Sequence, residues 1–155
     1  MSREKDVVGG SAWVVVVFFG GLFGGAGVNL LLPLPVLPGI WTRVLGSIPM
    51  AAGIGLFAWS RAAFRRRGTP IKVQVPTSAL VQDGPYAFSR NPIYLSFIII
   101  YVGWAFIFDS SYVLAMLLVV FVFFDRKVIS REEQYLEARF GDEYRSYKSR
   151  VRRWI

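Results

Sequence analysis

The 155-residue chain contains no cysteine and no histidine. Without them it can form no disulfide, no cysteine nucleophile and no histidine general base, and no zinc or haem site built on His or Cys. We therefore expect no metal site. Any chemistry must depend on carboxylates, arginine, tyrosine, amides and the backbone.

Charged residues are also scarce, at 18% of the chain, whereas hydrophobic residues make up 54% and the mean hydropathy is +0.46. The 18 Lys and Arg exceed the 10 Asp and Glu, so the formal net charge is +8. These charges are bunched between long uncharged runs. This pattern favours an integral membrane protein with basic loops and ends, and it argues against nucleic acid as a partner.

Four apolar runs, at about 12–32, 41–59, 93–108 and 112–128, predict four transmembrane helices in one membrane domain, 1–155. The fold class is therefore expected to be all-α. The first run is longer than the apolar core of a signal peptide, and we expect it to be retained. Prolines and Gly39 separate the first two runs, and Asp109-Ser110-Ser111 forms a tight turn between the last two.

The basic residues orient these helices. Arg61, Arg65, Arg66, Arg67 and Lys72 follow the second run, and a basic tail follows the fourth. Positive charge favours the cytoplasmic side. Both termini and both basic segments are therefore predicted to be cytoplasmic, in a multi-pass membrane protein.

Glycines in the first run form two overlapping G-x-x-x-G pairs, Gly20 with Gly24 and Gly21 with Gly25. Such spacing lets helix backbones approach closely. We favour packing within the chain over dimerisation, and the oligomeric state stays open.

The tail carries a helical pattern, because Leu136, Phe140, Tyr144, Tyr147 and Val151 recur at steps of three and four. Gly141 is expected to end one helix and Asp142 to cap the next. We therefore expect two helical pieces lying at the cytoplasmic membrane surface, with arginines toward anionic headgroups.

Two polar clusters converge in this topology, because the third and fourth helices form a hairpin whose ends lie near Asn91 and Arg126. Pro92 suits the first helical position and Asn91 the N-cap. This cap is compatible with a second role, because a helix N-terminus beside Arg90 also attracts an anion such as a carboxylate.

Glu132-Glu133 forms the second cluster, flanked by Arg126, Lys127 and Arg131. One interpretation is a solvated helix face laced with salt bridges. The other is that one glutamate receives an ammonium group or a pair of ribose hydroxyls.

These clusters also carry a family resemblance. The stretch from Leu80 to Tyr94 is similar to the pattern L-V-x-x-G-P-Y-x-x-x-R-H-P-x-Y of the isoprenylcysteine carboxyl methyltransferase and phospholipid methyltransferase superfamily. The tail from Glu132 to Tyr147 resembles that superfamily's E-E-x-x-L-x-x-x-F-G-x-x-Y-x-x-Y ending. The match covers roughly residues 80–155.

The resemblance implies methyl transfer from S-adenosylmethionine to a lipophilic acceptor, such as an isoprenylcysteine carboxylate, a phospholipid amine or a small hydrophobic nucleophile. It implies catalytic roles for Arg126 and Glu132. It also implies a cofactor site in the half 80–155, formed by Leu80, Gly84, Tyr86, Arg90, Asn91, Pro92, Tyr94, Leu95, Gly103, Glu132 and Glu133.

Two positions depart from the superfamily pattern: Asn91 stands in place of the usual histidine, and Ser96 stands where glycine often follows the tyrosine. A mechanism that uses the histidine as a base is therefore excluded. A non-catalytic scaffold or lipid-binding protein with the same fold is the alternative hypothesis. A transporter is disfavoured, because ionisable residues are absent from deep within the spans.

Overall fold

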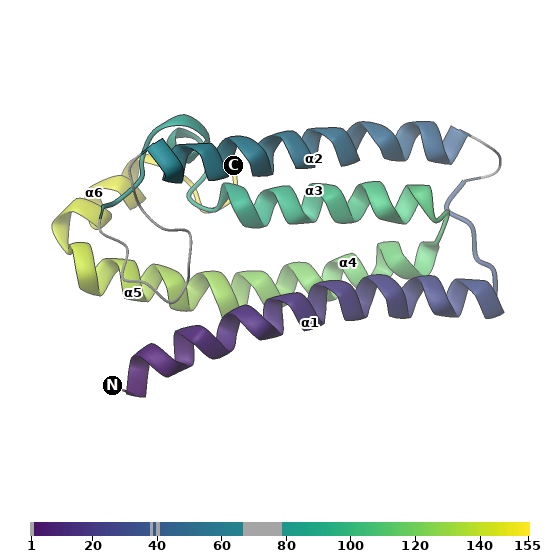
Figure 1. Ribbon diagram of the computed structural model, residues 1–155, viewed down its shortest axis with the longest axis horizontal. Coiled ribbons are helices and arrows are strands. Elements are labelled where there is room, and N and C mark those ends of the chain that lie inside the picture. The colour runs from purple at the N-terminus through teal and green to yellow at the C-terminus, as the bar shows by residue number, and fades with distance from the viewer. Residues whose placement is uncertain (1, 38, 40, 67–78) are drawn as a thin grey trace.

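The computed structural model describes residues 2–37, 39, 41–66 and 79–155, and within these ranges it contains helices and no strand (Figure 1). The all-helical prediction is therefore confirmed for this part of the chain. The elements are α1 (Ser2–Leu31), α2 (Trp41–Arg66), the 3₁₀ turn η1 (Gly84–Ala87), α3 (Pro92–Ile107), α4 (Ser111–Phe123), the π-helical turn η2 (Phe124–Ile129), α5 (Ser130–Phe140) and α6 (Asp142–Arg150).

The apolar runs at 12–32, 41–59 and 93–108 coincide with α1, α2 and α3, and the run at 112–128 spans α4 and η2. Among the described residues, only Trp13–Leu31 is by itself long and apolar enough to cross a bilayer, and Pro92–Ile107 is apolar but shorter. The prediction of four spans is therefore not settled by helix length. Arg67 and Lys72 of the basic loop lie outside the described residues.

A glycine seam joins α2 to α3. A Cβ atom added to Gly46 would lie 2.8 Å from the carbonyl oxygen of Gly103, and one added to Gly103 would lie 2.9 Å from the backbone nitrogen of Met50. Gly53 is equally close to the backbone of α3. These two helices are therefore in contact backbone to backbone, which only glycine permits.

A second seam joins α1 to α4. A Cβ atom on Gly25 would lie 3.0 Å from the backbone nitrogen of Val113, and one on Gly21 would lie 3.5 Å from Val120 Cγ2 in α4 and 2.8 Å from the hydroxyl of Tyr101 in α3. Gly20 and Gly24 have nothing within 4 Å of the same position. One of the two predicted glycine pairs thus packs within the chain, as expected, and the other faces outward.

The end of the bundle opposite α5 and α6 is closed by one carboxylate. Asp109, with φ of 46°, accepts hydrogen bonds from the backbone nitrogens of Val36 at 2.8 Å and Leu37 at 3.2 Å. Ser110 caps α4 by accepting from Val113. The predicted tight turn at 109–111 is confirmed, and it fastens the α1–α2 turn to the α3–α4 turn.

The helix α4 continues through η2 into α5 without a break. In η2, hydrogen bonds close over five residues instead of four, which changes the angular position of α5 relative to α4. Gly141, with φ of 53°, then ends α5, as its sequence position predicts. The expected cap from Asp142 is wrong: α6 begins at Asp142, whose carboxylate pairs with Arg145 at 2.6 Å.

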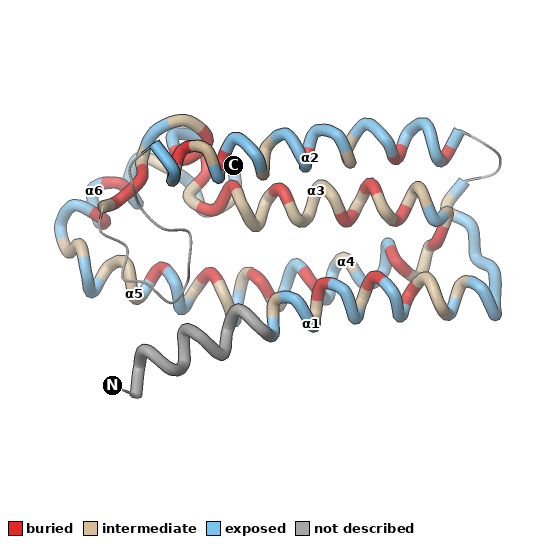
Figure 2. The backbone as a smooth tube through the Cα atoms, in the orientation of Figure 1, coloured by how far each residue is buried: buried red, intermediate tan, exposed pale blue. Residues whose placement is uncertain are grey.

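The outer faces of the bundle are apolar and exposed. Figure 2 shows exposed residues along the outer sides of α1, α2 and α4, and these include Phe23, Ile48 and Leu118, each more than 60% exposed. The buried core between the helices contains Phe18, Tyr101 and Phe124. So much exposed apolar surface is unusual for a protein surrounded by water.

The α2–α3 seam gives a first prediction. Gly46→Ala or Gly103→Ala should lower the free energy of unfolding by about 1–3 kcal/mol, because the added methyl group meets backbone atoms that cannot move aside. Thermal unfolding in detergent measures the change. The matched control is Gly55→Ala, also in α2, where nothing lies within 4 Å and helix propensity favours alanine. Equal melting temperatures for all three variants would contradict the seam.

Candidate functional site

The polar residues singled out by the sequence gather at the end of the bundle where α3 begins and α5, α6 and the C-terminus converge (Figure 1). Asn91 and Pro92 occupy the N-cap and first position of α3, as predicted. The Asn91 side chain makes no capping bond. Its Nδ2 instead donates to the carbonyl oxygen of Arg153 at 3.1 Å. Asn91 therefore ties the start of α3 to the end of the chain.

Arg90 and Glu133 form a buried ion pair. The Arg90 Nη2 lies 2.7 Å from the Glu133 Oε1, and their side chains are 9% and 6% exposed. Arg90 Nη1 also donates to the carbonyl oxygens of Lys148 at 3.1 Å and Val151 at 2.9 Å. The guanidinium is thus occupied by acceptors on α5, on α6 and at Val151, and Arg90 joins the segment just before α3 to these elements.

The C-terminal segment, Val151–Ile155, completes this network. Arg153 Nη2 lies 2.6 Å from the second oxygen of Glu133, and its Nη1 lies 3.1 Å from Asp125 Oδ1. Trp154 Nε1 donates to the same Asp125 oxygen at 3.0 Å, and its ring stacks on Phe121 with centroids 4.9 Å apart. The C-terminal segment is thereby held against η2 and α4.

Sequence reasoning missed Arg153, Trp154 and Asp125. One signal was available: Asp125 is a carboxylate at the end of an apolar run, and such a group requires a cationic or hydrogen-bonding partner. The partner lies 28 residues further along the chain, and no local pattern indicates that pairing.

The two adjacent glutamates have opposite electrostatic environments. Burial alone would raise the pKa of Glu133, but hydrogen bonds from Arg153 and Arg90 outweigh burial and hold the pKa below its usual value. Glu133 therefore remains ionised and is a counter-ion shared by two guanidinium groups, of which Arg153 also pairs with Asp125. Its environment is that of a structural ion pair.

Among the described residues, no cation lies within ion-pair distance of Glu132, and its Oε2 accepts a hydrogen bond of 3.0 Å from the Tyr94 hydroxyl. Surrounding protein removes water from the carboxyl, and although the Tyr94 bond opposes this effect, desolvation and the charge of Glu133 raise the pKa of Glu132 above its usual value. The residue nevertheless stays exposed at the surface. Glu132 is thus a carboxylate crowded by protein, still reachable and without a counter-ion.

Three further aromatic residues lie near the Glu132–Tyr94 pair: Tyr86, Phe97 and Phe124. Burial and the negative charge of Glu132 raise the pKa of the Tyr86 hydroxyl. Tyr86 is therefore close enough to that carboxylate to interact with it electrostatically. Below Tyr94 lie Phe124 and Phe97, with ring centroids 5.5 Å and 6.4 Å from the tyrosine ring. One acidic group therefore stands beside two tyrosines and an aromatic floor.

The first motif is also built into the tail. Leu80 packs with Tyr144 and Tyr147 in a buried cluster that includes Leu136 and Phe140. The Tyr147 hydroxyl donates to the carbonyl oxygen of Tyr86 at 2.7 Å. The periodic apolar residues of the tail therefore cover the motif, and Gly84, with φ of 61°, supplies the turn that starts η1.

Three further expected site residues form no hydrogen bond or ion pair with Glu132 in the described part of the chain. Gly103 lies nine residues beyond Tyr94 in α3, in the seam with α2. Leu95 is half-buried beside Tyr94. The Arg126 side chain is 78% exposed, and its ion partner is Asp125 at 3.5 Å. Their predicted functional roles stay predictions.

Comparison with known proteins identifies relatives of this chain. A family model described as "Phospholipid methyltransferase" matches residues 41–143. A 63-residue uncharacterised protein of Haemophilus influenzae is 40% identical to this chain over its full length, which covers 41% of this chain. The Protein-S-isoprenylcysteine O-methyltransferase of Schizosaccharomyces pombe is 39% identical over 74 residues, 46% of this chain but only 30% of that protein.

The described part of the chain is helical, and the comparisons place the chain in a superfamily of membrane-associated methyltransferases. The chain belongs to the phospholipid methyltransferase family, whose model covers about two thirds of it. The superfamily expected from the two sequence motifs is confirmed.

The adjacent glutamates give a second prediction. Glu133→Gln should lower the free energy of unfolding by about 3 kcal/mol, because it leaves two guanidinium groups without their shared counter-ion. Its neighbour supplies the control: Glu132→Gln removes the same charge from a desolvated site that holds no cation, and should leave stability unchanged or raise it. Thermal unfolding at pH 7 compares them.

Because the pKa of Glu133 is lowered by folding, its contribution to stability is present above the unfolded pKa and is lost as pH falls through the folded value. The stability difference between wild type and Glu133→Gln should therefore shrink on acidification. A difference that stays constant down to pH 3 would contradict the network.

Proposed function

We propose that this protein is an integral membrane methyltransferase that uses S-adenosylmethionine and transfers a methyl group to a lipophilic acceptor. The observation that carries the proposal is the Glu132–Tyr94 pair, a reachable carboxylate without a counter-ion beside the family motif. Family membership and the name of the fission-yeast relative support methyl transfer.

The residues present suit such a cofactor. Glu132 can accept an ammonium group or ribose hydroxyls. The backbone N–H groups of Ile93 and Tyr94 precede the first hydrogen bond of α3, from Leu95 to Asn91, and have no backbone acceptor in the described part of the chain, so they can donate to a carboxylate. The rings of Tyr86 and Tyr94 can face a sulfonium. When bound, the cofactor supplies an electrophilic methyl group.

In this proposal Arg90, Asn91, Glu133 and Arg153 act as positioning residues. They fix the start of α3 against α5, and this sets the distance between Tyr94 and Glu132. Alignment of reactants and exclusion of water are the main needs of an in-line displacement. Phe97 and Phe124 supply the dry side of the site.

The absence of histidine does not prevent this chemistry. A carboxylate or thiolate acceptor needs no base, and an amine acceptor can lose its proton to Glu132, whose raised pKa makes it a better base than an ordinary glutamate. The choice among isoprenylcysteine-type, phospholipid and small hydrophobic acceptors is left open by the apolar walls.

We further propose that α1, α2, α3 and the α4–η2 rod span the membrane, with both termini and the site on the cytoplasmic side. The exposed apolar faces of the helices support insertion in a bilayer, and Arg65 and Arg66 at the end of α2 support the orientation.

The alternative, a non-catalytic scaffold or lipid-binding protein, is favoured by one observation. Arg90, Glu133 and Asn91 are already engaged with one another or with the C-terminal segment. Cofactor binding distinguishes the two functions.

Isothermal titration of S-adenosylmethionine into the detergent-solubilised protein provides this third prediction. Wild type should bind, and Glu132→Gln should bind at least tenfold more weakly, because a charge-assisted hydrogen bond contributes about 1.5–3 kcal/mol. Glu137→Gln, which removes the same charge elsewhere on α5, is the control. No binding by folded wild type would eliminate the enzyme, and equal binding by all three proteins would eliminate the Glu132 site.

The same titration should depend on pH. Because the pKa of Glu132 is raised, wild-type affinity should already fall at a pH above the usual range for glutamate, as the carboxylate takes up a proton. Glu132→Gln should lack that component.

A fourth prediction concerns orientation, and the absence of cysteine makes it clean. Leu34→Cys lies in the exposed α1–α2 turn and Ser149→Cys lies in the exposed tail. In sealed right-side-out vesicles, a membrane-impermeant maleimide should label the first and spare the second until detergent is added. The reverse pattern would invert the proposed topology.

A further inference from the structure

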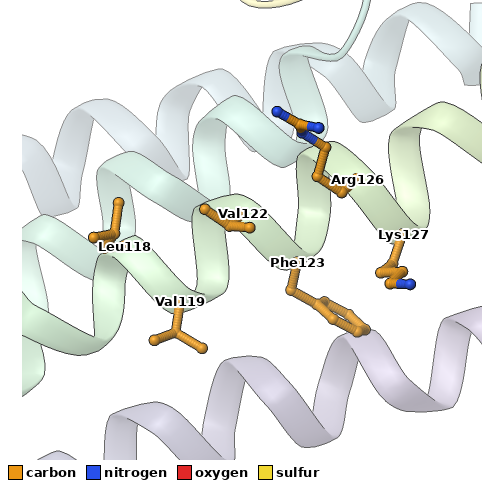
Figure 3. A pocket seen from close by; sticks show the side chains of 6 residues that line it. All are labelled: Leu118, Val119, Val122, Phe123, Arg126 and Lys127. Carbon is orange, nitrogen blue, oxygen red and sulfur yellow. The ribbon is translucent and has the colours of Figure 1, made fainter.

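A groove on the outer face of α4 and η2 lies apart from the Glu132–Tyr94 pair. Its volume is about 430 Å³, and Figure 3 shows the six side chains that line it. They are Leu118, Val119, Val122, Phe123, Arg126 and Lys127. The groove is therefore apolar along most of its length and cationic at one end.

The spacing of these residues makes the groove a continuous stripe. They are neighbouring pairs at i, i+4 and i+8, which lie on one face of a helix. At 1.5 Å per residue the stripe is about 13 Å long. That length is close to half of the roughly 30 Å hydrocarbon core, the depth of a single leaflet.

The two cations have little to neutralise them. The Arg126 Nε lies 3.5 Å from Asp125 Oδ2, and the other oxygen of that carboxylate already receives Arg153 and Trp154. Within the described part of the chain, no acidic group lies at ion-pair distance from Lys127. Two exposed positive groups thus border an apolar stripe and share a fraction of one negative charge.

We infer that this groove binds one anionic phospholipid of the cytoplasmic leaflet. The phosphate would lie between Arg126 and Lys127, and an acyl chain would follow Val122 and Leu118 toward the middle of the bilayer. Charge complementarity selects the anionic headgroup, and the length of the stripe selects a lipid over a soluble anion. The inference rests on the proposed membrane insertion and is independent of methyl transfer.

A second groove supplies a matched comparison. It is lined by Phe57, Ala58, Arg61, Ala62 and Arg65 on α2, with a volume of about 300 Å³. The guanidinium of Arg61 lies 5.8 Å from the centre of the Phe57 ring and so makes a cation–π interaction within the protein. Removing both arginines here subtracts the same charge without touching the α4 groove.

The fifth prediction is tested by native mass spectrometry of the full-length, detergent-purified protein, titrated with phosphatidylglycerol or phosphatidylcholine in the absence of cofactor. Wild type should retain one phosphatidylglycerol in preference to phosphatidylcholine. Arg126→Gln combined with Lys127→Gln should weaken phosphatidylglycerol binding by about tenfold or more, because each cation near an anionic lipid contributes on the order of 1 kcal/mol. Arg61→Gln combined with Arg65→Gln should bind as wild type does.

Two results would overturn the inference: equal retention of both lipids by wild type, or an equal loss in both double variants, which would indicate diffuse attraction. Lys127→Gln alone should show part of the loss, and it lies outside the predicted cofactor site. Thermal unfolding confirms that each variant is folded. Because lipid retention is measured without S-adenosylmethionine, failure here leaves methyl transfer untouched, and failure of cofactor binding leaves the lipid site untouched.

Discussion

The carboxylate of Glu133, held between the guanidinium groups of Arg90 and Arg153, is the interaction on which the rest of the site depends. Its Oε1 accepts from both arginines and its Oε2 accepts from Arg153, so a single side chain joins the start of α3, the first turn of α5 and the C-terminal segment. Leaving a buried charge without its partner is strongly destabilising. The three elements are therefore held in the relative positions that keep these ion pairs formed. Tyr94 lies in α3 and Glu132 lies in α5, so the same ion pairs also set the position of these two side chains relative to each other.

The arrangement separates two tasks that the sequence presents as one motif. In Glu132-Glu133, adjacent residues lie about 100° apart around a helix, so one side chain faces inward and the other outward. Glu133 is 4% exposed and paired with two arginines, whereas Glu132 is exposed and, within the described ranges, is hydrogen-bonded to Tyr94 alone. The inward residue supplies rigidity. The outward residue retains a charge that a ligand can use.

The sequence was sufficient to predict the helices, the tight turn at 109–111, the end of α5 at Gly141 and the meeting of the two motifs, because each depends on apolar periodicity or on short-range backbone chemistry. It was not sufficient for the partners of Glu133, Asp125 and Asn91. Apart from Arg90, those partners lie in Val151–Ile155, a segment without regular structure that follows α6 and contacts residues far away in the sequence. Long-range side-chain pairing of this kind leaves no local pattern.

The π-helical turn η2 adds one residue to what would otherwise be a single straight α-helix from Ser111 to Phe140. This additional residue rotates the side chains of α5 about the helix axis relative to those of α4. The groove that runs from Leu118 on α4 to Arg126 and Lys127 within η2 lies on the outer face of the rod, whereas beyond η2 Glu132 and Glu133 on α5 contact Tyr94 and Arg90 at the start of α3. The direction in which Glu132 and Glu133 point is therefore a property of the count of residues between Phe124 and Ile129 as much as of the glutamates themselves. The groove on α4 and the glutamates on α5 can therefore point in different directions although they belong to one continuous helical rod.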